Sequence, residues 1–172
     1  MGKQIIRDRR IVMDDWSHVE DEAALPSSGK IIVSHTRWQA DKATLAKRGD
    51  VGISIPPTLD VATLAPDLPS LALIALPFNF IQPKPEGGRT FDGRSYSQAR
   101  LLRERFGYKG EIRAIGDIFR DSMHYAWRCG VNAFELAAGR DLDDALKGFD
   151  DFSTHYQAAA DDPTPIFRRR KA

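Results

Sequence analysis

The sequence predicts an α/β protein with about five mainly parallel strands that alternate with helices. From residue 31 onward, short β-branched or apolar runs alternate with segments of helical periodicity, the order that produces parallel strands with right-handed crossovers. The run at 71–76 is apolar at every position, as expected of a strand covered on both faces. We therefore predict an open doubly wound sheet. A partial barrel-like β/α fold is the alternative, because 172 residues fall short of the roughly 250 that a complete eight-unit barrel needs.

Residues 1–172 are predicted to form one α/β domain that begins with a short hairpin. The hairpin covers residues 4–13, with its turn near Asp8-Arg9. The polar stretch at 14–29 ends in Pro-Ser-Ser-Gly and predicts a loop.

The first parallel strand and helix follow this loop. The β-branched run at 31–33 predicts the strand, and residues 37–48 predict a helix that ends at Gly49. A second strand is expected at 51–55, before two prolines, and a third at 71–76.

A long loop is predicted at 77–93, where three prolines and three glycines gather. Unstructured loops longer than about 12–15 residues are uncommon and are often functional or disordered. Residues 79–90 could order over a ligand or form a tolerated insertion, and we favour the insertion.

The helix after this loop has a start signal and a stop signal. Ser95 and Gln98 have the spacing of a capping box, in which each side chain bonds to the backbone of the other residue. Gly107 is expected to end the helix.

The remaining elements continue the alternation. A fourth strand is expected at 111–115, and Asp117 is expected to cap a helix at 118–129. A fifth strand at 134–137 precedes a long last helix that Asp141 opens. The chain then ends in a basic tail at 163–172.

Charged residues near the predicted carboxyl ends of the strands form the candidate site. Ligands of open parallel sheets bind at these ends, and a helix N-terminus attracts anions. Arg94 adds a planar fork that suits phosphate, sulfate or carboxylate. Arg113 would need a carboxylate partner if its strand is central, with Asp92, Glu111 and Asp117 as candidates. The proposed anion-binding set is Asp92, Arg94, Ser95, Arg113 and Asp117.

The composition argues against several classes of protein. The net charge is +1 and the longest apolar run, at 71–78, is short, so we expect neither nucleic acid nor a membrane as a partner. The N-terminal residues lack the apolar core of a signal peptide, and the lone cysteine, Cys129, is expected to pack in the core. We expect a cytoplasmic protein. The sequence lacks the usual motifs for binding a nucleotide, a flavin or a metal, so any cofactor and any catalytic residue stay unknown.

Residues 91–134 resemble a bacterial family of unknown function that is described as an oxidoreductase associated with assimilatory sulfite reduction. The blocks Asp-Gly-Arg-Ser-Tyr-Ser at 92–97 and Arg-Ala-Ile-Gly-Asp at 113–117 carry the resemblance, which covers about residues 50–137. It implies a role beside sulfite reductase and other sulfate-assimilation enzymes, and it supplies no catalytic residues. The chain departs from the family at 79–90 and 121–124.

Three functions agree with these observations. The first is an accessory protein of sulfite reduction that binds a small anion or a redox partner at the carboxyl ends of the strands. The second is a small oxidoreductase or transferase of sulfur metabolism. The third is a non-catalytic interaction protein for sulfite reductase that uses the acidic helix at 141–151 and the basic tail. Association into a homo-oligomer is left open.

Overall fold

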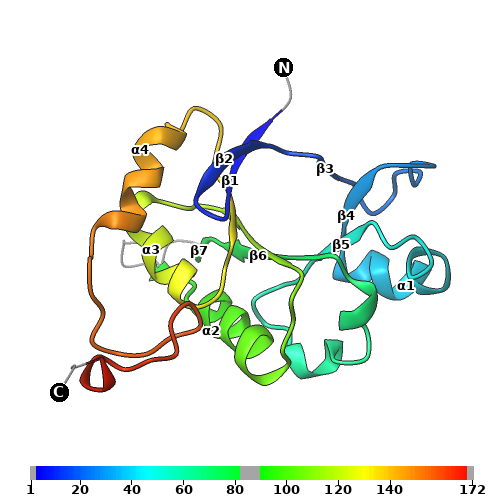
Figure 1. Cartoon of the computed structure of the whole chain (residues 1–172). Coiled ribbons are helices and arrows are strands. Elements are labelled where there is room, and N and C mark those ends of the chain that lie inside the picture. The colour runs from blue at the N-terminus through cyan, green and yellow to red at the C-terminus, as the bar shows by residue number, and fades with distance from the viewer. Residues whose placement is uncertain (1–2, 82–89, 170–172) are drawn as a thin grey trace.

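The computed structural model describes residues 3–81 and 90–169 (Figure 1). Most of the predicted insertion at 79–90 and the last residues of the basic tail therefore lie outside the described residues.

The fold is a curved mixed sheet that contains eight strands in the described part of the chain. Its order is β2-β1-β10-β9-β6-β5-β4-β3. The hairpin β1–β2 is antiparallel, β1 pairs antiparallel with β10, and the strands from β10 to β3 pair parallel. The strand bounds are Gln4–Arg7 (β1), Arg10–Met13 (β2), Trp16–His18 (β3), Lys30–Ser34 (β4), Val51–Ser54 (β5), Leu73–Phe78 (β6), Glu111–Gly116 (β9) and Ala133–Glu135 (β10).

The α/β class is confirmed, but the doubly wound sheet of five strands is wrong. From β3 to β10 the parallel strands follow one another in chain order, so every crossover moves along the sheet in the same direction. The sheet therefore has no point at which the strand order reverses. It curls into an open half-barrel, which agrees with the alternative fold, the partial barrel.

The N-terminal hairpin is confirmed with its predicted turn. Asp8 and Arg9 have φ angles of 50° and 60°, the left-handed conformation of a tight type I′ hairpin turn. The predicted loop at 14–29 is wrong at residues 16–18, which form the edge strand β3.

Four α-helices lie along one side of the curved sheet (Figure 1). Side chains of all four belong to one hydrophobic core with Ile53, Ile74 and Phe134 of the sheet. Their bounds are His35–Leu45 (α1), Arg94–Arg100 (α2), Arg120–Arg128 (α3) and Leu142–Lys147 (α4). A π-helical turn at Leu101–Arg105 extends α2, and short 3-10 turns lie at Val61–Leu64, Leu68–Ser70, Gly148–Asp150 and Ile166–Arg168. None of the helices in the described ranges is long and apolar enough to cross a membrane.

Two of the predicted helix starts are wrong and one is confirmed. Ser95 donates to the carbonyl of Pro77, and the Gln98 amide donates to carbonyls outside α2, so they form no capping box. Asp117 caps no helix, because α3 begins after Phe119. Asp141 does cap α4, since its carboxylate accepts from the backbone N–H groups of residues 143 and 144. That helix is short rather than long.

The segment between β6 and α2 contains a small second sheet. The strands Phe80–Ile81 (β7) and Thr90–Phe91 (β8) pair antiparallel. The rings of Phe80 and Phe91 contact each other at 5.4 Å between centroids, and Phe80 contacts Phe119 at 5.9 Å. This hairpin therefore packs beside the carboxyl ends of β6 and β9.

Candidate functional site

The five residues predicted to bind an anion lie in three places. Asp92, Arg94 and Ser95 lie at the start of α2, Arg113 lies within β9, and Asp117 follows β9. The backbone N–H of Phe80 donates to Asp117 at 3.4 Å, which connects this carboxylate to the small second sheet.

At the start of α2, a carboxylate already occupies the arginine fork. Arg94 donates to Asp92 from Nε at 2.9 Å and from Nη2 at 2.6 Å, and its backbone N–H also donates to Asp92. These hydrogen bonds keep the pKa of Asp92 below its usual value. Asp92 thus supplies the negative charge that an external anion would bring, so this helix start is a poor anion site.

Arg113 is completely buried on the sheet face opposite the helices and is surrounded by carboxylates. Both terminal nitrogens donate to Asp14, at 3.0 and 2.9 Å, while Nε donates to Glu111 at 2.7 Å. Nη1 also lies 3.4 Å from Glu135. Of the predicted partners only Glu111 contacts Arg113. Its position makes it a structural residue of the sheet rather than a residue open to ligand.

Charged side chains connect distant parts of the sheet across this face. The edge strand β3 is separated from β10 by four strands, yet His18 of β3 lies 3.0 Å from Glu135 of β10. Asp15 likewise pairs with both Arg7 of β1 and Lys30 of β4. We call the whole set the polar cluster: Lys3, Arg7, Asp14, Asp15, His18, Lys30, Glu111, Arg113 and Glu135.

Glu135 is the carboxylate most strongly affected by this cluster. Burial alone would raise its pKa, but hydrogen bonds from His18 and Lys3, together with their charges, outweigh burial and lower the pKa from 4.5 to about 2. Oε1 accepts from Lys3, and Oε2 accepts from His18 and Arg113.

The lowered pKa of Glu135 predicts a loss of stability in acid. Because its folded pKa lies below its unfolded value, its contribution is present above about pH 4.5 and is lost as the pH falls through about 2. We expect up to about 3 kcal/mol of unfolding free energy to disappear over this range. Urea titrations between pH 6 and pH 2 will measure it. Glu135→Gln should reduce the loss, whereas Glu104→Gln, at an exposed helical pair, should not. An equal loss in the Glu135 variant would contradict this assignment.

Two adjoining cavities lie at the carboxyl end of β10. One has a volume of about 430 Å³ and is lined by Lys3, Gln4, Leu142 and the segment 136–140. The other has a volume of about 260 Å³ and extends toward Phe119 and Arg120. Both are lined by Leu136, Gly139 and Arg140. We call the larger one the β10 cavity.

The charges around the β10 cavity favour an anion. Lys3 and Arg140 line it, and no carboxylate residue does among the described residues. Arg140 is exposed and stacks on the ring of Phe119 at 5.0 Å, and it forms no ion pair within the described ranges. In the second cavity, by contrast, Arg120 is paired with Asp144 and Asp151.

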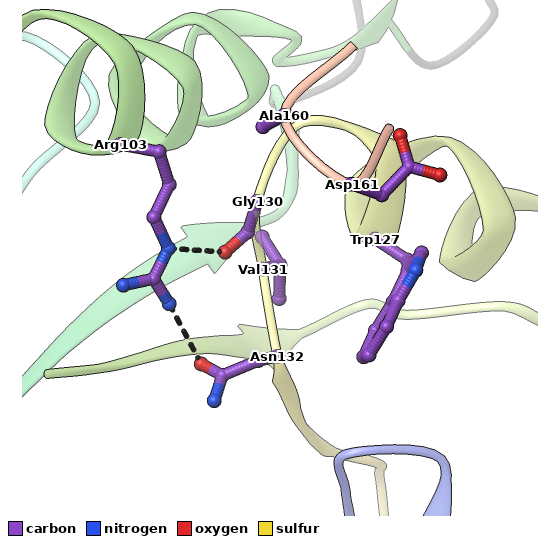
Figure 2. Close-up of a pocket in the computed structure, with 7 residues that line it drawn as sticks. All are labelled: Arg103, Trp127, Gly130, Val131, Asn132, Ala160 and Asp161. Atoms are coloured by element: carbon purple, nitrogen blue, oxygen red, sulfur yellow. Dashed lines mark hydrogen bonds between the residues drawn. The ribbon is translucent and has the colours of Figure 1, made fainter. Parts of the chain in front are cut away.

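A third cavity lies at the opposite end of the sheet, beside Asn132 (Figure 2). Arg103 donates there to the carbonyl of Gly130 at 2.9 Å and to the side chain of Asn132 at 3.0 Å. It also donates to the carbonyls of Tyr108 and Gly110. Arg103 thus connects two turns at the amino ends of the strands, the end of β/α folds that serves stability.

Sequence reasoning missed the residues of the β10 cavity and most of the polar cluster. Arg140 follows a strand, which was a usable signal. Lys3, Asp14 and His18 lie in the N-terminal segment and reach Glu111, Arg113 and Glu135 only through the curl of the sheet, for which the sequence carries no local signal.

Residues 52–167 match the model of a family described as bacterial protein of unknown function (DUF934). No curated protein matches the chain. The matched segment contains all five predicted residues together with Glu135 and Arg140, and it does not include Lys3, Asp14 or His18.

Proposed function

The chain belongs to the bacterial family DUF934, and on that premise we propose that it is an accessory protein of assimilatory sulfite reduction that binds a small anion at the carboxyl ends of its strands. The observation that carries the proposal is the β10 cavity, where Arg140 lacks a carboxylate partner among the described residues. Lys3 lines the same cavity, and its ammonium group also pairs with Glu135. Sulfite and sulfate are anions of the class that such groups bind.

One difference between the two positions favours the β10 cavity over the start of α2 as the proposed anion site. Ligands of β/α folds bind beyond the carboxyl ends of the strands, and both positions satisfy that rule. The guanidinium of Arg94, however, is hydrogen-bonded to Asp92. The guanidinium of Arg140 stacks on the ring of Phe119 and has no carboxylate partner among the described residues. Of these two arginines, Arg140 is therefore the one that an anion can approach without displacing a carboxylate of the described residues.

Anion binding to the intact protein tests this proposal. We expect sulfite or sulfate to raise the melting temperature, because a ligand at 100 times its dissociation constant adds about 2.7 kcal/mol. Arg140→Ala should reduce the affinity at least tenfold and leave the melting temperature of the free protein unchanged. Arg94→Ala serves as the matched control and should keep the affinity.

Other results would redirect the assignment. Loss of binding in the Arg94 variant alone would move the site to the start of α2. A protein that sulfite, sulfate, phosphate and sulfonucleotides all fail to stabilise would contradict the anion site.

A second candidate function is an interaction protein for sulfite reductase. The observation in its favour is the exposed aromatic surface of the C-terminal part, where Tyr156 and Phe152 are 83% and 63% exposed. Binding to sulfite reductase without any small-molecule binding would favour it. A small oxidoreductase of sulfur metabolism is the third candidate, and a chromophore in the purified protein would favour that one.

A further inference from the structure

We infer that anion binding in the β10 cavity takes up a proton at His18, with Lys3 shared between the anion and Glu135. This inference rests on the function proposed above and assigns roles to two residues outside the family match. The juxtaposition that carries it is the carboxylate of Glu135, which contacts Lys3 on one oxygen and His18 on the other.

Lys3 belongs to the cavity and to the polar cluster at the same time. It lines the β10 cavity with Arg140, and its ammonium group donates to Oε1 of Glu135. Its side chain is about half exposed, while that of Glu135 is only 11% exposed. An anion in the cavity attracts this ammonium group away from a carboxylate that has little access to water.

Glu135 then needs another positive charge in place of the Lys3 ammonium group. A buried carboxylate that loses its cationic partner is costly. Arg113 cannot move closer, because Asp14 and Glu111 hold three of its nitrogens. The remaining cations of the polar cluster, Arg7 and Lys30, pair with Glu111 and Asp15.

His18 is the residue that can supply the charge. Its ring lies 3.0 Å from Oε2 of Glu135, and its side chain is 42% exposed, so a proton can reach it from solvent. A protonated ring donates to Glu135 with a full positive charge. This charge replaces the positive charge of Lys3 beside Glu135, and it also attracts the anion.

Binding of the anion and binding of the proton at His18 are thermodynamically linked, so each strengthens the other. A lower pH therefore strengthens anion binding. We expect the affinity for sulfate to rise roughly fivefold between pH 7.5 and pH 5.5. A change of this size corresponds to the attraction between the anion and one added positive charge near a protein surface. Sulfate is the probe because its own charge is constant over this range.

The experiment measures sulfate dissociation constants at three pH values in a cationic buffer with constant chloride. The full-length protein is compared with His18→Gln, which keeps a hydrogen-bond donor but cannot change its charge. His35→Gln is the matched control, because His35 is partly exposed and its side chain hydrogen-bonds to Gln39, away from the polar cluster. The expected result is a fivefold rise in the wild type and in the His35 variant, and constant affinity in the His18 variant.

A second variant keeps the inference testable if His18→Gln does not fold. Lys3→Met should weaken sulfate binding and remove its pH dependence. Constant affinity in the wild type, or an undiminished pH dependence in either variant, would overturn the proton uptake and leave the anion site in place. Absence of sulfate binding at every pH in the wild type would overturn both the anion site and the inference.

Discussion

Replacement of Arg113 by alanine is expected to lower the free energy of unfolding by about 3–5 kcal/mol, as for other buried charge clusters that lose one partner. Its guanidinium is fully buried and contacts Asp14, Glu111 and Glu135. The variant leaves three carboxylates, each no more than 11% exposed, without their shared cation. Such a loss is a large part of the stability of a domain of this size.

Urea denaturation at pH 7 measures this effect. Arg100→Ala provides the control, because Arg100 forms an exposed helical pair with Glu104, and such pairs contribute about 0.3–0.5 kcal/mol. Equal changes in the two variants would show that the polar cluster contributes no more than a surface ion pair.

Replacement of Phe78 by alanine should cost a similar amount, about 3–5 kcal/mol, by the loss of buried surface and the cavity left behind. Phe78 ends β6 and is fully buried. Its ring contacts Tyr96 of α2 at 4.9 Å and Phe91 at 6.2 Å between centroids. We expect the small second sheet and the start of α2 to loosen together, because both pack on this ring.

Thermal and urea unfolding of the Phe78 variant test this expectation. Phe152→Ala removes the same side chain from a position that is 63% exposed and should change stability by less than about 0.5 kcal/mol. If the Phe78 variant retained wild-type stability, the aromatic contacts at the end of β6 could not be part of the core.

Local patterns predicted the elements of the core better than their arrangement. The β-branched and apolar runs identified β4, β5 and β6, because the residues of a buried strand are visible in a short window. Strand order was missed, since doubly wound sheets and half-barrels show the same alternation of strands and helices along the chain. The two folds differ in which face of the sheet each helix covers. Here the buried residues of all four α-helices meet on one face.

The capping signals show how tertiary contacts override local chemistry. Ser95 and Gln98 have the spacing of a capping box, but α2 packs against the segments that follow β5 and β6. Carbonyl groups of Pro56, Leu59 and Pro77 take up both side chains there. Ser34, in contrast, caps α1 by accepting from the N–H of Arg37 at 2.9 Å.

In the candidate site, too, some contacts could be predicted from the local sequence and others depend on the fold. The need of Arg113 for carboxylate partners followed from its place in a strand, and Glu111, two positions away, is one of them. Asp14 is 99 positions away in the sequence, and only the curl of the sheet brings it near. The Arg94 fork was recognised from the sequence, but its occupation by Asp92 depends on the geometry of the turn between them.

The order of the strands bears on how the chain acquires its structure during synthesis. From β3 to β10 each parallel strand pairs with the one made just before it, so this part can assemble progressively as it leaves the ribosome. The hairpin β1–β2 differs, because its sheet partner β10 is made last; Asp8 and Asn132, which hydrogen-bond beside this junction, are 124 positions apart. Closure of such a long loop is entropically costly and slow. The hairpin is translated before the parallel strands and is thus among the last segments to join the sheet. Lys3 and Arg7 reach Glu135 and Glu111 only at that final step.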